Sequence, residues 1–229
     1  MKIFADTADW KEMSRLATDD QVQGFTTNPT LARKAGVKNY AEWGAVCAEM
    51  FSELPISFEV VGDDEDEMYR QARLIASWGK NVYVKIPVTD TSGRPMRGMI
   101  GRLVKDGIKV NVTAVFTRTQ VFDLQLVLEQ KVPSIISIFA GRIHDAGQDA
   151  TRTFRDCRAI ATVIGAQLLW ASPRQVYDII LAEDCGADII TVTPELLAKA
   201  KLIGKDLDEF SRETVQMFYD DAKQAGFTL

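Results

Sequence analysis

The sequence predicts a single (β/α)8 barrel, of α/β class, followed by a C-terminal helical extension. Three observations predict this fold. Short β-branched runs alternate with longer stretches of 3.6-residue periodicity, eight such runs can be counted, and no low-complexity linker divides the chain. A length of 229 residues suits one barrel as well as two small domains, so the repetition, not the length, favours one domain over residues 1–229.

The expected strands lie at regular intervals along the chain. They are Lys2 to Asp6, Gly24 to Asn28, Ile56 to Val61, Asn81 to Val88, Lys109 to Phe116, Ser134 to Phe139, Gln167 to Ser172 and Ala187 to Val192. An open doubly wound sheet is the alternative, and it usually carries a glycine-rich turn after its first strand. Here that turn is Asp6-Thr7-Ala8-Asp9, which has no glycine. A closed barrel is therefore expected.

Helices are expected between these strands. Apolar residues in Met96 to Val104 and in Phe154 to Ile164 recur at helical spacing, which would lay one apolar stripe on the sheet. Several helical stretches end in a glycine that suits a left-handed C-cap, at Gly79, Gly107, Gly165 and Gly186. After the last strand come Pro194 to Lys201 and a final segment of about residues 206–226. We expect this segment at an oligomer interface or, as the alternative, packed across the barrel wall.

Composition excludes several classes of partner. The net charge is -5 and the basic residues are scattered among acids, so no basic stripe predicts nucleic-acid binding. The acidic run Asp63 to Glu67 indicates a helix start. The three cysteines, Cys47, Cys157 and Cys185, lack metal or redox spacing and are expected to be buried free thiols. No segment reaches roughly 18 uninterrupted apolar residues, so we expect no membrane partner and a cytoplasmic location.

The fourth expected strand holds a lysine where lysines are rare. Val82, Val84, Ile86 and Val88 form one aliphatic face, which leaves Lys85 on the face that points into the barrel. Burial generally favours the neutral amine, and a neutral amine attacks carbonyl carbons. Lys85 is therefore either a Schiff-base nucleophile or one half of a structural ion pair with Glu59 or Asp6, and the pattern alone does not separate the two.

Other expected strands also carry polar residues toward the barrel interior. Asp6 and Asn28 end the first and second strands, Glu59 lies in the third, and Asn111 and Thr113 alternate with valines in the fifth. Carboxyl ends of barrel strands converge on one mouth, where such barrels keep their active sites. One polar residue of this kind is usually a cap or a satisfied core group, but several together predict a site.

The seventh strand and the loop after the sixth are interpreted less directly. In the seventh strand we place Leu168, Trp170 and Ser172 on the inner face, so that Trp170 narrows the pocket. His144 is expected in a loop after the sixth strand, at the surface or, as the less favoured alternative, touching a substrate.

Six segments together resemble the transaldolase family, and more narrowly its short-chain branch, which includes fructose-6-phosphate aldolase. They are Phe4-Ala5-Asp6-Thr7-Ala8, Gly24-Phe25-Thr26-Thr27-Asn28-Pro29-Thr30, Glu59-Val60-Val61, Val84-Lys85-Ile86-Pro87, Asn111-Val112-Thr113 and Phe139-Ala140-Gly141-Arg142-Ile143. The Thr26 to Pro29 segment and the Lys85 strand are the most specific parts. The likeness weakens after about residue 145.

The resemblance implies a set of roles for these residues. Lys85 would form a Schiff base with a donor ketose, and Asp6 and Glu59 would move protons, Glu59 through a water held with Thr113. Asn28, Asn111 and Ser137 would bind donor hydroxyls, with Thr27 beside them. No metal or other cofactor is implied, and the single histidine has no ligand cluster around it.

The resemblance also bears on the reaction and on the phosphate. Transaldolases of this family carry glutamate and phenylalanine at the positions of Glu59 and Phe139, where the aldolases carry glutamine and tyrosine. Arg142 matches the family's phosphate-binding arginine. After the seventh strand the family has a serine closely followed by a basic residue, whereas here Pro173 separates Ser172 from Arg174. Arg174 therefore either reaches the phosphate or is an exposed arginine at a helix start.

Three functions remain open from the sequence. The leading one is transfer of a dihydroxyacetone unit from a ketose phosphate to an aldose phosphate. The second is an aldolase that releases dihydroxyacetone, and the third is a non-catalytic sugar-phosphate-binding barrel. The resemblance further implies ring-like homo-oligomers, pentamers or decamers.

Overall fold

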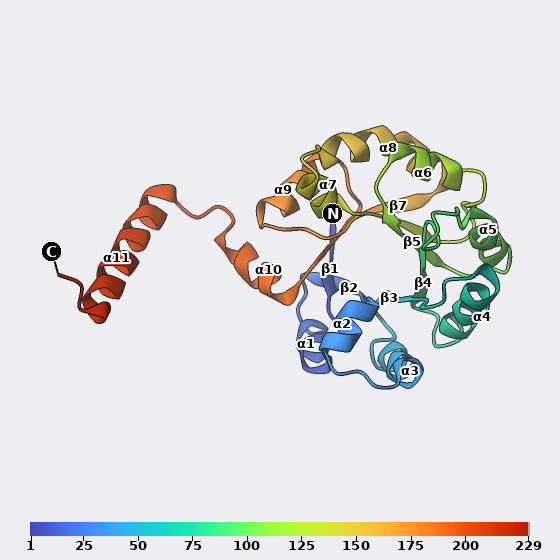
Figure 1. The fold of residues 1–229 in the computed structure, drawn as a ribbon, viewed down its shortest axis with the longest axis horizontal. Coiled ribbons are helices and arrows are strands. Elements are labelled where there is room, and N and C mark those ends of the chain that lie inside the picture. The colour runs from blue at the N-terminus through green and yellow to red at the C-terminus, as the bar shows by residue number, and fades with distance from the viewer. Residues whose placement is uncertain (229) are drawn as a thin grey trace.

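Residues 1–228, which a computed structural model describes, form a closed barrel of eight parallel strands surrounded by helices (Figure 1). The strands are β1 Lys2–Asp6, β2 Val22–Thr26, β3 Ile56–Glu59, β4 Val82–Pro87, β5 Val110–Val115, β6 Ser134–Ile138, β7 Ala166–Trp170 and β8 Ile189–Val192. Each strand pairs in parallel with the next, and β8 pairs with β1, so the sheet has no open edge. The predicted (β/α)8 fold is confirmed.

The helices follow the strands in alternation. They are α1 Trp10–Leu16, α2 Pro29–Lys34, α3 Tyr40–Met50, α4 Glu65–Ala76, α5 Arg97–Lys105, α6 Arg118–Leu124, α7 Ala140–Asp145, α8 Ala150–Ile164, α9 Tyr177–Asp184, α10 Pro194–Lys199, the short 3-10 helix η1 Ala200–Leu202, and α11 Leu207–Ala225. The acidic run does begin α4, with Asp64 as its N-cap. In the described part of the chain, no helix combines the length and the apolarity that a membrane span needs.

The strand ends differ from the predicted ones by up to two residues, and the second strand shows why. We expected it to run to Asn28, but β2 stops at Thr26. The Asn28 side chain accepts a hydrogen bond from Leu31 N and caps α2, with Pro29 as the first helical residue. A capping asparagine followed by proline is a strong helix start, and here it ends the strand early.

The glycine prediction holds at three positions and fails at the fourth. Gly107, Gly165 and Gly186 have left-handed backbone conformations just before their strands. Gly79 does not, and the C-cap of α4 is Ser77. A Cβ at Gly79 would lie 2.5 Å from Asn81 Oδ1, so a close approach of the Asn81 side chain, not a positive φ, requires glycine there.

Two apolar layers hold the barrel together. The larger lies between strands and helices and includes the valine and isoleucine face of β4, as predicted, together with the three free cysteines. A smaller cluster fills the barrel interior with Phe4, Ile135, Leu169, Ala171 and Ile189. Interior positions that this cluster does not fill carry the polar side chains described below.

The C-terminal helix is set apart from the barrel. Figure 1 shows α11 extending away from α10 and from the barrel on a short connection. Within the described residues, none of its side chains is buried. Its exposed apolar side chains include Phe210, Met217, Phe218 and Tyr219, the last two about 60% exposed (Phe218 62%, Tyr219 63%).

Candidate active site

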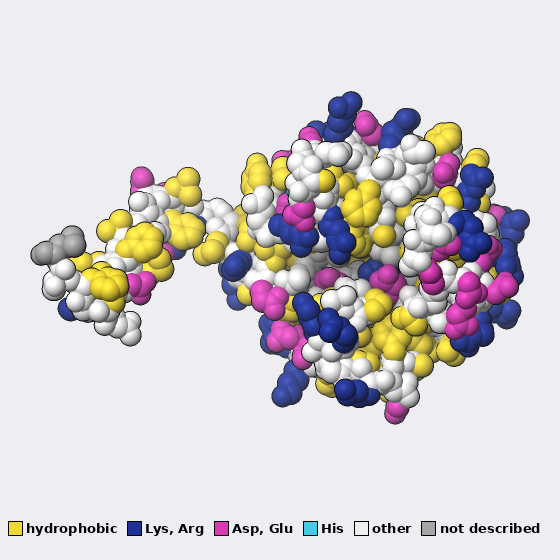
Figure 2. Space-filling model, viewed as in Figure 1, with side chains coloured by type: hydrophobic (Ala, Val, Ile, Leu, Met, Phe, Trp, Pro, Cys, Tyr) yellow, Lys and Arg dark blue, Asp and Glu magenta, His cyan; other side chains and the backbone are white. Residues whose placement is uncertain are grey.

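The mouth at the carboxyl ends of the strands is hollow, and Figure 2 shows basic and acidic side chains inside it and around its rim. A cavity of about 130 Å³ opens there. It is lined by eight of the residues selected from the sequence: Asp6, Asn28, Lys85, Thr113, Ser137, Phe139, Arg142 and Ser172. This space has room for several water molecules, so a small polar ligand can occupy it.

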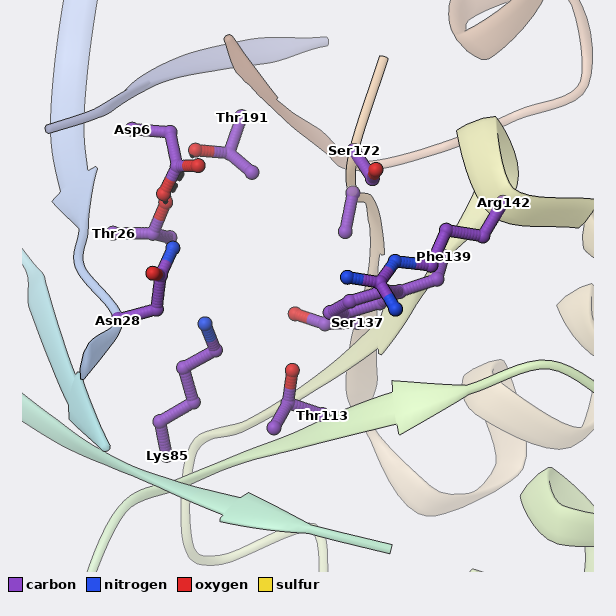
Figure 3. A pocket seen from close by; sticks show the side chains of 11 residues that line it. Asp6, Thr26, Asn28, Lys85, Thr113, Ser137, Phe139, Arg142, Ser172 and Thr191 are labelled. Carbon is purple, nitrogen blue, oxygen red and sulfur yellow. Dashed lines mark hydrogen bonds between the residues drawn. The ribbon is translucent and has the colours of Figure 1, made fainter. Parts of the chain in front are cut away.

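Lys85 lies at the centre of this cavity. Its neighbours Val84 and Ile86 are buried against the helices, so the lysine points inward from β4 (Figure 3) and is only 6% exposed. The amine nitrogen lies 3.1 Å from Thr27 O and 3.2 Å from Glu59 Oε2. Strand register places Glu59, Lys85 and Asn111 side by side on β3, β4 and β5. The predicted ion pair with Glu59 therefore exists, inside a cavity that a ligand can enter.

Asp6 faces the same cavity from the end of β1. Thr26 Oγ1 donates to Asp6 Oδ1 at 2.7 Å and also contacts the hydroxyl of Thr191. Burial raises the pKa of Asp6, and the positive charge of Lys85 lowers it by less, so the net shift is upward. A carboxyl group with a raised pKa next to an amine can take up and return a proton more readily than a surface aspartate.

A hydrogen-bonded chain joins three strands beside the lysine. Asn111 Nδ2 donates to Ser57 Oγ at 3.0 Å, and Ser137 Oγ donates to Asn111 Oδ1 at 2.7 Å. Among the described residues, Thr113 Oγ1 is buried and has no hydrogen-bond partner. Thr113 precedes Ala114, whose φ of 57° marks an irregularity in β5. An unpaired buried hydroxyl facing a cavity suits a bound water or a substrate hydroxyl.

The opposite side of the mouth is built from the ends of β6 and β7. Arg142 is exposed, its guanidinium carbon lies 5.6 Å from the centre of the Phe139 ring, and it makes no ion pair with any described residue. Ser172 has a φ of 62°, a strained conformation for a residue other than glycine. A Cβ at Gly141 would lie 1.6 Å from Ser172 O, so the two segments touch through their backbones. This contact fixes the backbone from which the Arg142 side chain extends.

Known proteins resemble this chain over nearly its whole length. The model of the family described as Transaldolase/Fructose-6-phosphate aldolase matches residues 3–229. The chain belongs to this family. A probable transaldolase from Streptococcus agalactiae is 36% identical over 218 residues, covering 93% of this chain and 97% of the relative. Another, from Hyphomonas neptunium, is 34% identical over 232 residues and covers 100% of both chains.

A solved structure supports the fold of this transaldolase-family chain. The tetrameric deoxyribose phosphate aldolase from Aeropyrum pernix superposes with a TM-score of 0.61 over 88% of this chain and 90% of that one, at 16% identity. At that identity the likeness concerns the barrel alone.

Four of the selected residues do not line the cavity. Glu59 and Asn111 contact it through Lys85 and Ser137, as described above. Thr27 turns its hydroxyl to Ser57 O, and its backbone carbonyl, not its side chain, meets the amine. Arg174 binds Asp145, with its Nη2 2.6 Å and its Nε 3.2 Å from Asp145 Oδ2. A direct substrate contact by Thr27 or Arg174 stays a prediction.

The prediction for Trp170 is wrong. Its ring faces outward, where it stacks on Phe154 of α8 at 5.0 Å between ring centres and meets His144 edge-on at 5.6 Å. Leu169 and Ala171 take the inner face instead. Both faces of β7 are apolar, so the alternation of polarity does not reveal which one is inside. The prediction that His144 lies in a loop is also wrong, because α7 extends through Asp145 and half-buries the imidazole.

The sequence interpretation missed several residues of this family member's site. Thr26 and Thr191 line the cavity beside Asp6, and Ser57 anchors Asn111. The two threonines carry a signal that could have been used, since each alternates with buried apolar neighbours in its strand. Tyr40, on α3, contacts the backbone of Glu59 and gives no such signal.

Proposed function

We propose that this chain transfers a dihydroxyacetone unit from a ketose phosphate to an aldose phosphate through a Schiff base on Lys85. The observation that carries the proposal is the buried Lys85 amine, held 3.2 Å from Glu59 in a cavity that Asp6 also lines. A purely structural ion pair has no need of such a cavity. The family shown above contains enzymes of this aldol type.

The proposed chemistry begins with the lysine. The neutral amine adds to the C2 carbonyl of the ketose, and loss of water forms an iminium. A carboxylate then takes the proton of the C4 hydroxyl, the C3–C4 bond breaks, and its electrons move into the iminium to give an enamine. The released aldose leaves, the enamine carbon attacks the aldehyde of the acceptor, and water cleaves the new ketose from Lys85.

The residues supply the proton transfers and the binding. Asp6, with its raised pKa, removes the proton of the C4 hydroxyl and returns a proton to the oxygen of the acceptor aldehyde, and Glu59 acts through a water at the free hydroxyl of Thr113. The three-carbon fragment lies beside Asn28 and Ser137, which line the cavity, and Asn111 supports Ser137 by accepting its hydrogen bond. Arg142 lines the same cavity from β6, and its free guanidinium binds the phosphate.

Phe139 favours transfer over release. Its apolar ring forms part of the cavity wall, so it gives the enamine no proton. An enamine that is not protonated waits for an aldehyde, whereas a phenol at this position would speed its conversion to free dihydroxyacetone. The Phe139→Tyr variant is therefore expected to release free dihydroxyacetone faster than the wild-type protein, as measured in the absence of acceptor.

Borohydride trapping tests the proposal. The protein is reduced in the presence of fructose 6-phosphate and digested, and the peptides are examined by mass spectrometry. We expect one adduct on Lys85, none in Lys85→Met, and an unchanged adduct in Lys105→Met, which changes an exposed lysine of α5. No adduct in the wild-type protein would leave the non-catalytic barrel as the better explanation.

Adding erythrose 4-phosphate then separates the two enzymes. Product formation that depends on this acceptor supports transfer. Free dihydroxyacetone formed at the same rate without the acceptor supports the aldolase instead.

We further propose that α11 packs on a second copy of the chain. Its apolar side chains are exposed on a helix that stands apart from its own barrel, and a patch of this kind usually marks a contact with another protein (Figure 2). Sedimentation should show an oligomer for the wild-type chain and smaller species for the double variant Met217→Glu, Phe218→Glu. Leu126→Glu, which changes an apolar side chain that is 69% exposed on the barrel, is the matched control and should leave the assembly intact.

A further inference from the structure

The backbone hydrogen bonding between β2 and β3 is interrupted at the carboxyl ends of the two strands. Phe25 N donates to Pro55 O, and Thr27 N donates to Ser57 O. In a parallel ladder the bonds are evenly spaced, so the next one would run from Glu59 N to Thr27 O. That bond is replaced, because Glu59 N donates to the Tyr40 hydroxyl at 3.1 Å, and Thr27 O accepts from the Lys85 amine at 3.1 Å.

The phenol of Tyr40 therefore meets both residues that hold the amine. The Thr27 side chain lies close to it as well. Burial raises the pKa of Tyr40 to about 12, and the hydrogen bonds with the Glu59 backbone and the Thr27 side chain lower it by less. The phenol thus keeps its proton at neutral pH, and its oxygen accepts from Glu59 N.

Tyr40 is held in place by aromatic packing. It is the first residue of α3, and its ring centre lies 5.6 Å from Trp43 and 6.4 Å from Trp78. Both tryptophans pack edge-on against Phe58, the residue before Glu59. These contacts hold the phenol against the end of β3.

We propose that Tyr40 is a positioning residue of the Schiff-base site. Its hydroxyl accepts the hydrogen bond of Glu59 N, the last backbone donor of β3, and this leaves the Thr27 carbonyl to hold the Lys85 amine. Without the phenol, the Glu59 N–H is left to its regular ladder acceptor, Thr27 O, where it competes with the Lys85 amine. The ladder then closes, and the amine loses one of its two partners. This inference rests on the proposed function of Lys85.

The test compares the rate of borohydride-trapped adduct formation and the steady-state constants of Tyr40→Phe with those of the wild-type protein. The expected loss is about 10-fold in kcat and in trapping rate, the effect of roughly one hydrogen bond at the reacting amine. KM should stay within about threefold, since the residues that touch the substrate are unchanged. Tyr69→Phe removes a phenol that binds Asp106 on the outside of the barrel, and it should leave both rates as in the wild-type protein.

Three outcomes separate the possibilities. A lower melting temperature with unchanged kcat and trapping rate means that Tyr40 only stabilises the fold, and this overturns the inference alone. No adduct in the wild-type protein overturns the proposed function and the inference with it. If Tyr40→Phe does not fold, 3,5-difluorotyrosine at position 40 keeps the ring while weakening the phenol oxygen as an acceptor, and a trapping rate equal to that of the wild-type protein would then count against the inference.

Discussion

The two sides of the mouth are built differently. On the β1 to β5 side, the reactive groups are strand residues whose positions follow from the register, with Glu59, Lys85 and Asn111 in one row. On the β6 to β7 side, they follow the strands, and their positions depend on a close backbone contact at Gly141 and a left-handed Ser172. We infer that the first side carries the bond-making chemistry and that the second side places the rest of the substrate.

Gly141→Ala should give the largest difference between the functions of the two sides. A Cβ at Gly141 would lie 1.6 Å from Ser172 O, so one of the two segments has to shift. We expect kcat/KM for a phosphorylated ketose to fall at least about 100-fold, as after a displacement of about 1 Å. Trapping of unphosphorylated dihydroxyacetone on Lys85 should change much less, because Lys85, Asp6 and Glu59 lie on the other side.

The matched control is Gly98→Ala in α5. The nearest atom to a Cβ there is Glu65 Oε1 at 4.0 Å, so we expect full activity and about 0.5–1 kcal/mol more stability from the better helix former. If Gly141→Ala lowered trapping of dihydroxyacetone as much as turnover of the phosphate, the two sides would not be separable.

The two arginines of the second side should differ in effect. Arg142 has no ion-pair partner within the described residues, whereas Arg174 is bound to Asp145. For a phosphorylated donor, Arg142→Ala should raise KM about 10-fold to 100-fold through the loss of charge-assisted hydrogen bonds. Arg174→Ala should have a smaller effect, because contact with the phosphate would first have to break the ion pair. An equal loss in the two variants would show that Arg174 does reach the phosphate.

Trp170→Phe tests the outward orientation of the ring. Trp170 stacks on Phe154, and its indole nitrogen has no hydrogen-bond partner among the described residues. The smaller ring should cost about 1–2 kcal/mol of stability, which lowers the melting temperature by roughly 2–4 °C per kcal/mol in a chain of this size. KM and kcat should stay unchanged. A change in KM at temperatures where the variant is fully folded would mean that the ring reaches the cavity.

The sequence predicted the first side better than the second for a physical reason. In β4 and β5 a continuous aliphatic face leaves only one place for Lys85 and Asn111, so a period of two decides their direction. In β7 both faces are apolar, and Trp170 was assigned to the wrong one. Tyr40 could not be found at all, because its contact with Glu59 joins a helix to a strand end that local patterns do not relate.

The smallest expected effect concerns Asp6, the first side's proton carrier. Because burial raises its folded-state pKa above the unfolded value, Asp6 contributes stability at pH values below that unfolded value, and this contribution is lost as the pH rises through the folded value. Asp6→Asn keeps an oxygen to accept from Thr26 and has no charge to bury. The variant should therefore melt at a higher temperature than the wild-type protein at pH 7, and the difference should vanish as the pH falls toward about 4. A difference in melting temperature that does not depend on pH would show that hydrogen bonding at this end of β1, and not the burial of charge, sets the effect of Asp6 on stability.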